Sequence, residues 1–204
     1  MKSLAAAMTV LLMFLFAFRY AYQVRKGKIS PVLSMWVVFF AGAFIGLISY
    51  ASAESRDFLT GIQNVVDLGA ITVIIISILL WGKTKKAYFQ RFEKRYLFFA
   101  AVIILFWVIW KSAFYSNILT QILMTWAYFP TIQNLIAKKK NTESFSSWML
   151  VFFAQLCALA PAFIEGNLLA ALYVVRAEVM TIVLLVIMTC YHFKNGQNKR
   201  ANLI

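Results

Sequence analysis

Seven long apolar stretches, almost free of charged residues, constrain this chain more than any other feature. A helix needs about 17 to 25 predominantly apolar residues to cross the hydrocarbon core of a bilayer. The stretches are Leu4–Arg19 with an extension to Tyr22, Pro31–Ser52, Leu59–Trp81, Leu97–Trp110, Ile118–Ala137, Ser147–Ile164 and Asn167–Tyr191. Hydrophobic residues make up 63% of the 204 positions, more than a soluble core of this size can bury. The sequence therefore predicts an all-α membrane protein with seven transmembrane helices.

The fourth stretch has the shortest uncharged run and ends directly before Lys111. A run that short can also be a core or interfacial segment. We count it as a span because Lys111 can extend its charged end to the interface and residues 112–115 can complete the length.

The basic residues fall on one side of the predicted membrane. Sixteen of the twenty follow the first, third, fifth or seventh stretch: Arg19, Arg25, Lys26, Lys28, Lys83, Lys85, Lys86, Arg91, Lys94, Arg95, Lys138, Lys139, Lys140, Lys194, Lys199 and Arg200. The opposite side has Lys2, Arg56 and Lys111, and Arg176 lies inside the seventh stretch. Basic loops stay cytoplasmic, so the N-terminus is expected outside and the C-terminus inside. The net charge of +13 thus indicates topology and contact with anionic lipid, and no nucleic acid is expected.

The first stretch follows Lys2 and so imitates a signal peptide, but "FRYAYQVRKGK" contains no convincing cleavage site of small residues. We expect it to be retained as a helix. The strongly basic loops and brief connections are typical of a bacterial inner (cytoplasmic) membrane protein, with an organellar membrane as the alternative.

Nothing in the sequence resembles the residue pattern of an enzyme. His192 is the only histidine, no metal-ligand spacing occurs, and no glycine-rich phosphate loop is present. Cys157 and Cys190 lie in apolar stretches without a spaced partner, so we expect two reduced, buried thiols. The sequence predicts no enzymatic activity, no cofactor and no metal.

An internal repeat divides the chain. A shift of 112 residues matches Lys26 with Lys138, Lys28 with Lys140, Ser30 with the similar Thr142, Ser34 with Ser146, Trp36 with Trp148, Phe40 with Phe152 and Leu47 with Leu159. A shift of one residue fewer matches Asp67 with Glu178. Chance matching of apolar sequence is the alternative. The pattern predicts a 3+1+3 plan of parallel repeats about an axis along the membrane normal. Its parts are a first bundle (1–82), a basic loop with a linker helix (83–114), a second bundle (115–192) and a cytoplasmic tail (193–204).

The segment "YFPTIQNLIAKKKNTESFSSW", residues 128–148, resembles the PQ-loop pattern of the SWEET, MtN3 and cystinosin-type transporters. Their helices have a Pro-Gln-type kink followed by a basic turn and a serine-rich helix start. Pro130 stands at the proline position, Thr131 replaces the expected glutamine, and Gln133 follows two residues later. The first repeat has "FRYAYQ" without a proline. The chain is also similar to the PnuC vitamin carriers, which share the seven-helix plan without that motif.

Proline explains part of this segment. Pro130 has no amide hydrogen, so a carbonyl about one turn earlier loses its partner and the helix can bend there. We therefore predict a hinge at Pro130 and Gln133, and a kink at Pro161. Ser144, Ser146 and Ser147 are residue types that cap the start of a helix. The alternative is that the segment only punctuates helices and has no gating role.

Polar and charged side chains inside apolar stretches are the best candidates for a substrate site, because they are costly at membrane depth unless they face a cavity or a partner. Gln63, Asn64 and Asp67 share one face of the third helix. Arg176 and Glu178 are two positions apart, about 200° of helical rotation, and face different directions. Since the third and seventh helices are equivalent, their polar faces should meet between the repeats. The resemblance implies the same, because SWEET-like carriers flank the sugar with paired polar residues of these two helices.

Further residues complete the predicted substrate site. Gln121 and Thr125 share a face of the fifth helix, and the rings of Trp126 and Tyr173 can stack on a substrate. The same stacking is considered for Trp107, Trp110 and Tyr128. Trp36 and Trp148 are expected to be anchors at the membrane interface.

Two readings of the charged residues stay open. Asp67 and Arg176 either bind an anionic or zwitterionic substrate or form a permanent ion pair that joins the repeats. Glu178 could bind a proton and couple transport to it.

These features predict a membrane carrier that moves a small polar solute, sugar-like in the first instance, by alternating access. An amino acid, a vitamin or a nucleoside is the alternative substrate, with or without proton coupling. A channel stays open, as does a non-transporting receptor or scaffold, because the KDEL receptor shares the same helical plan. The expected partners are the small-molecule substrate and the lipid bilayer; a homo-oligomer is left open.

Overall fold

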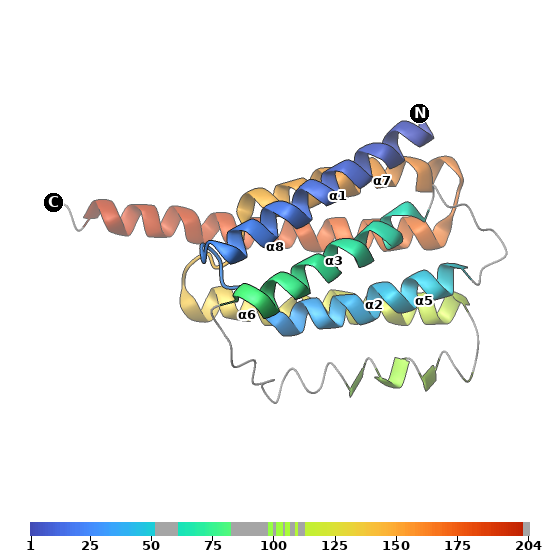
Figure 1. Ribbon diagram of the computed structural model, residues 1–204, viewed down its shortest axis with the longest axis horizontal. Coiled ribbons are helices and arrows are strands. Elements are labelled where there is room, and N and C mark those ends of the chain that lie inside the picture. The colour runs from blue at the N-terminus through green and yellow to red at the C-terminus, as the bar shows by residue number, and fades with distance from the viewer. Residues whose placement is uncertain are drawn as a thin grey trace.

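The structure, a computed structural model, describes residues 1–51, 61–82, 98–99, 101–103, 105–106, 109 and 113–201 (Figure 1). Within these ranges every regular element is a helix. The helices are α1 (Lys2–Arg25), α2 (Leu33–Ala51), α3 (Ile62–Trp81), α5 (Ala113–Ala127), α6 (Phe129–Lys138), α7 (Phe145–Ile164) and α8 (Leu168–Ala201). Part of the fourth predicted span, including Trp107 and Trp110, lies outside the described residues, as do Arg56, Lys111 and the basic loop 83–97.

Among the described residues, four helical segments are long and apolar enough to cross a membrane: α1, α3, α7 and Leu168–Tyr191 of α8. Leu33–Ile48 in α2 is a shorter apolar segment. Large apolar side chains such as Phe14, Leu80 and Val186 cover the outside of the bundle, as expected for helices that face lipid. The prediction of an all-α chain is therefore confirmed for the described residues, and these segments are compatible with membrane spans.

The helix bounds differ from the predicted spans mainly in α1, α2, α5 with α6, and α8. α1 runs on to Arg25, and α2 begins at Leu33, after the helix-restricting Pro31. The predicted fifth span, 118–137, is divided into α5 and α6. α8 continues past Tyr191, the predicted end of the last span, to Ala201.

The helices pack as a ring of six neighbours. α1 contacts α3 and α7, α2 contacts α3 and α5, and α8 contacts α7 and α5, while the short α6 contacts α2 and α8. α3 thus lies between α1 and α2, and α8 lies between α7 and α5. Exchanging α1, α2 and α3 for α5–α6, α7 and α8 reproduces the same set of neighbours.

Two pairs of residues that the 112-residue shift matches touch each other. The rings of Trp36 and Trp148 are stacked, with centroids 6.0 Å apart and planes inclined by 23°. The backbone amide of Ser30 donates to the carbonyl oxygen of Thr142 at 3.1 Å. When two copies of a unit are related by a two-fold axis, equivalent residues meet only beside that axis. The turns that precede α2 and α7 therefore lie together at the centre of one end of the bundle.

The expectation that Trp36 and Trp148 anchor the protein at the membrane interface is wrong. Each ring is only 2% exposed, and both pack into the buried core with Phe16 and Tyr128. Each tryptophan lies one turn into its helix, a position that is also typical of an interface anchor. In this fold the same position places each ring between the two halves of the protein. Burying both rings there removes a large apolar area from solvent.

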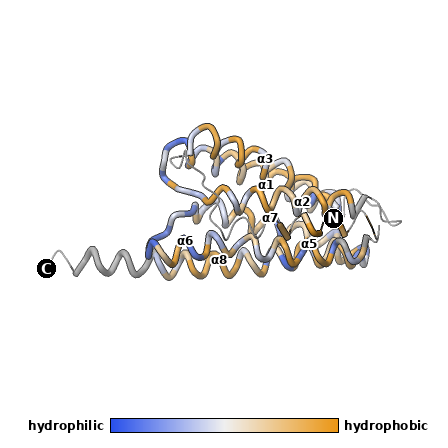
Figure 2. Tube along the Cα trace, turned by 90° about the horizontal axis from the view of Figure 1, so that it is seen from below, coloured by the Kyte–Doolittle hydropathy of each residue, from blue (hydrophilic) through white to orange (hydrophobic). Residues whose placement is uncertain are grey.

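Polar and basic turns gather at the end of the bundle where α6 lies (Figure 2). Arg19 on α1 donates through Nε to Oγ of Ser146 on α7 at 2.7 Å. At the opposite end, Nζ of Lys2 and Oε1 of Glu165 form an ion pair at 2.6 Å. Contacts between α1 and α7 therefore connect the two halves at both ends.

The prediction of two buried thiols is wrong for Cys190. Both cysteines are free, but Cys157 is half-buried and Cys190 is exposed. Cys190 lies on an outer groove between α7 and α8, beside Met149 and Thr189, because its face of α8 points away from the bundle.

Candidate functional site

The site begins with the break between α5 and α6. Tyr128 separates the two helices, its amide donating to the carbonyl oxygen of Thr125 at 3.3 Å. Pro130 occupies the first turn of α6, a position where a proline is tolerated because it has no amide hydrogen to pair. The ring of Tyr128 is buried and lies edge-on to Phe39, with centroids 4.8 Å apart. The helical hydrogen bonding is therefore interrupted at Tyr128, two residues before Pro130.

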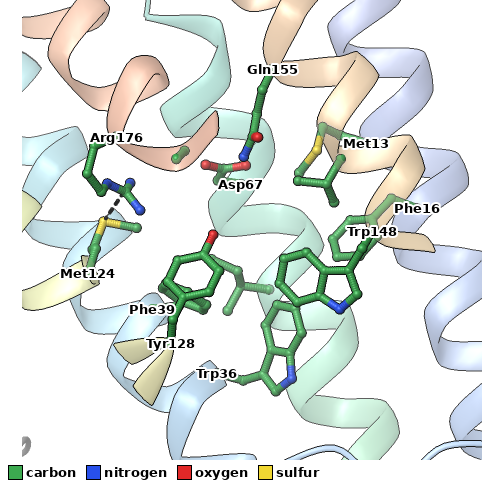
Figure 3. A pocket seen from close by; sticks show the side chains of 13 residues that line it. Met13, Phe16, Trp36, Phe39, Asp67, Met124, Tyr128, Trp148, Gln155 and Arg176 are labelled. Atoms are coloured by element: carbon green, nitrogen blue, oxygen red, sulfur yellow. Dashed lines mark hydrogen bonds between the residues drawn. The ribbon is translucent and has the colours of Figure 1, made fainter. Parts of the chain in front are cut away.

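A cavity lies at the centre of the ring of helices (Figure 3). The volume of this cavity is about 40 Å³, which is enough for a few water molecules. The lining residues come from both halves: Met13, Phe16, Trp36, Phe39, Asp67, Ile71, Met124, Tyr128, Trp148, Val151, Gln155, Arg176 and Ala177. Polar groups on one side thus face an aromatic and apolar wall on the other.

Asp67 on α3 is held by two neutral donors. Its Oδ1 accepts from Nε2 of Gln63, one turn earlier on α3, at 2.6 Å. Its Oδ2 accepts from the hydroxyl of Tyr173 on α8 at 2.7 Å. Gln155 on α7 points its amide toward Asp67, and its buried Oε1 has no hydrogen-bond partner in the described part of the chain (Figure 3). The structure therefore brings α3 and α8 together through Gln63, Asp67 and Tyr173.

Arg176 reaches the same cavity from α8. Its Nε donates to Oε1 of Gln121 on α5 at 3.1 Å, and its Nη2 lies 3.6 Å from the sulfur of Met124. The guanidinium lies 5.2 Å from the centre of the Tyr173 ring, a cation–π distance. Gln121 in turn donates to Oδ1 of Asn117 at 3.2 Å, which fixes the orientation of its amide. Gln121 therefore orients the arginine.

Asp67 and Arg176 do not form an ion pair with each other. The residues that bond to each are neutral, and both charged groups line the one cavity. Of the two open readings, the structure does not show the permanent ion pair. Two opposite charges instead stand apart at the edge of a buried space.

A layer of aromatic rings closes the cavity toward the end where α6 lies. Trp36 packs on Phe16 and Phe39, with centroids 6.2 Å and 5.9 Å apart, and Trp148 packs on Tyr128 at 6.0 Å. The indole nitrogens of Trp36 and Trp148 point away from Asp67 (Figure 3). Opening the cavity toward this end requires these rings to separate.

Other predicted site residues do not line the cavity. Asn64 is buried near Gly46, and Thr125 donates to the backbone carbonyl of Gln121. Glu178 is buried on a different face of α8 from Arg176, and neither of its carboxylate oxygens has a partner among the described residues. Trp126 is 39% exposed and packs edge-on to Phe99 on the outside of the bundle.

The predicted hinge residues also lie away from the cavity. Pro130 is buried at the start of α6, and Pro161 is buried inside α7. Gln133 is exposed.

The sequence interpretation missed Gln155 and Glu143. Gln155 lies seven residues after Trp148 and four after Val151, on one face of α7, so helical periodicity could have placed it with them. Glu143 follows three lysines and reads as a solvated loop residue, yet it is only 4% exposed. The sequence contains no local signal for its burial.

No family model matches the chain, and no curated protein or solved structure matches it either. The function is therefore inferred from the geometry of the site.

Proposed function

We propose that the protein is a carrier for a small zwitterionic solute, moved by alternating access between two three-helix bundles. One bundle is α1–α3, and the other is α5–α6 with α7 and α8. The observation that carries the proposal is that Asp67 and Arg176, opposite charges from the two bundles, face one central cavity without pairing. A charge at membrane depth is costly and marks a substrate or ion pathway by default.

The unused hydrogen-bonding capacity indicates the kind of solute. A guanidinium has five N–H donors and can hold a carboxylate by two parallel bonds. The described contacts of Arg176 use its Nε and Nη2, the latter only with a weak sulfur acceptor. Each oxygen of Asp67 has a lone pair beyond its one described bond, which suits an ammonium group. A solute with both charges, such as an amino acid, satisfies both residues; a neutral sugar, which the sequence favoured first, satisfies neither charge.

The arrangement of the helices supports alternating access. The two halves have corresponding neighbours, and Trp36 touches its repeat equivalent Trp148, as expected near an axis between parallel repeats. Ligand pockets generally have volumes of roughly 300 to 1,000 Å³. The central cavity is far smaller, so a solute can enter only if the bundles separate at one end.

The resemblance to SWEET and PQ-loop transporters supports the same plan. In this proposal the end with α6 faces the cytoplasm, the N-terminus is outside, and a bacterial inner membrane holds the protein. Basic residues at the α6 end, among them Lys26, Lys28 and Lys138, favour that orientation.

Solute counterflow in proteoliposomes tests the proposal. The purified protein is screened against amino acids, sugars, vitamins and nucleosides, first by thermal shift and then by uptake. We expect saturable uptake of a zwitterion. Asp67→Asn and Arg176→Gln should each weaken binding about tenfold to a hundredfold, because each loses hydrogen bonds between charged groups. Lys28→Gln, which removes an exposed charge far from the cavity, is the matched control and should bind normally.

Two outcomes would contradict the proposal. Uptake of a neutral sugar that survives both charge substitutions would assign the cavity to another substrate class. Tight binding without any uptake would indicate a receptor.

A further inference from the structure

A second buried carboxylate lies beyond the aromatic layer. Glu143 belongs to the turn between α6 and α7, outside the membrane-spanning segments, and is almost completely buried. Its Oε2 accepts from the hydroxyl of Tyr20 at 2.6 Å and from Nε1 of Trp148 at 3.3 Å. Its Oε1 is also buried and has no hydrogen-bond partner among the described residues. Such a group is unusual in a turn that follows three exposed lysines.

The two donors to Glu143 come from different halves of the protein. Tyr20 lies on α1 in the first bundle, and Trp148 lies on α7 in the second. Close by, Thr142 accepts from Ser30 across the same junction, and Ser146 accepts from Arg19. Trp148 is also part of the aromatic layer that closes the cavity. Separation of the bundles at this end must therefore break the bond between Tyr20 and Glu143 and admit water to the carboxyl group.

We propose that Glu143 is a proton-binding site that controls this end of the carrier: its protonated form holds the bundles together, and proton loss favours their separation. The inference rests on the proposed carrier function and adds a regulatory ion to it. In the closed form, an ionised Glu143 is buried away from water and one of its oxygens has no described partner. Opening of this end restores its hydration, so the ionised form favours opening. A protonated carboxyl has much less hydration to regain, so it tolerates the closed arrangement.

The titration of Glu143 is set mainly by its burial. Burial raises the pKa of Glu143 to about 7, while the hydrogen bonds from Tyr20 and Trp148 and the charge of Lys138 act in the opposite direction. In an open, hydrated end the pKa would return toward the ordinary value of about 4.3. The closed form therefore binds the proton more tightly. The stabilisation of the closed form by this proton is complete at a pH below the ordinary pKa of a glutamate, and it is lost as the pH rises through about 7.

Among the side chains that the structure describes, few other ionisable groups face this carboxyl. Tyr20 on α1 and Lys138 at the end of α6 are the nearest that influence it. Arg19 on α1 is bonded to the neighbouring Ser146, and α2 has no charged residue in its sequence. Lys139 and Lys140 are exposed in the turn before it. Within the described side chains, titration of this end near pH 7 is therefore assigned to Glu143.

Electron spin resonance distances between labels at this end test the inference without any solute. Lys26→Cys at the end of α1 and Ala137→Cys on α6 place labels on exposed positions of the two bundles, in a background with Cys157→Ala and Cys190→Ala. We expect one short distance at about pH 5 and a growing longer-distance population as the pH rises through about 7. Glu143→Gln, which imitates the protonated carboxyl, should keep the short distance throughout. Glu165→Gln removes a carboxylate that contacts α1 at the opposite end and should keep the wild-type response.

Tyr20→Phe gives a second test should Glu143→Gln fail to fold. It removes one donor to the ionised carboxylate, so the longer-distance population at about pH 8 should increase. A wild-type distance that does not change with pH, or a pH response that persists in Glu143→Gln, would overturn the inference. Because no solute is involved, this failure is distinct from failure of the carrier proposal, which the counterflow screen decides.

Discussion

At the scale of single residues, the close approach of α2 to α5 depends on Gly42. A β-carbon at Gly42 would lie 2.4 Å from Cγ of Met124, the residue whose sulfur contacts Arg176. Gly69 on α3 is the natural comparison, since a β-carbon there would meet nothing within 4 Å. Small residues at such crossings let helices pack closely in membranes.

Gly42→Ala should therefore destabilise the protein, by about 1 to 3 kcal/mol, because the added methyl group forces α2 and α5 apart or moves Met124. Gly69→Ala should leave stability unchanged or raise it by up to about 1 kcal/mol, since alanine is the better helix former. Thermal unfolding in detergent measures both. Equal behaviour of the two variants would mean that the α2–α5 contact is not close.

At the scale of elements, Pro130 lies at the break between α5 and α6, two residues after Tyr128. It occupies the first turn of α6, so its replacement should cost little stability. Pro130→Ala should change the free energy of unfolding by less than about 1 kcal/mol, yet lower turnover, because a continuous helix bends less easily. Counterflow rates beside thermal unfolding measure the two effects. Turnover at the wild-type level would show that the break between α5 and α6 is not a hinge.

Helical spacing explains where sequence interpretation succeeded and failed. Gln63 and Asp67 lie on one face because α3 is continuous, and helical spacing holds along it. Trp126 and Tyr128 are two positions apart, about 200° of helical rotation, so only one of the two rings can face the cavity. Tyr128 lines the cavity, and Trp126 is 39% exposed on the outside. The sequence alone does not show which of two neighbouring rings faces inward, because both sides of this helix are apolar.

At the scale of the whole molecule, the spans and the ring of helices differ in how well they could be predicted. An apolar stretch such as Ile62–Trp81 is recognisable because the transfer of each residue into lipid is a local property. The burial of Glu143 depends on Tyr20, more than a hundred residues earlier in the chain, and no local pattern reports such a contact. The repeat comes closest to predicting a distant contact, since it matches Ser30 with Thr142 and the two residues are hydrogen-bonded.

The orientation of the whole molecule determines which compartment Glu143 senses. Sixteen of the twenty basic residues follow the first, third, fifth and seventh predicted spans, so the end with α6 should be cytoplasmic. In intact cells, a membrane-impermeant thiol reagent should label Ser3→Cys near the N-terminus but not Lys26→Cys, with Cys157 and Cys190 replaced. Permeabilised cells, where both positions should react, are the control. Labelling of Lys26→Cys alone in intact cells would reverse the orientation, and Glu143 would then respond to the external pH.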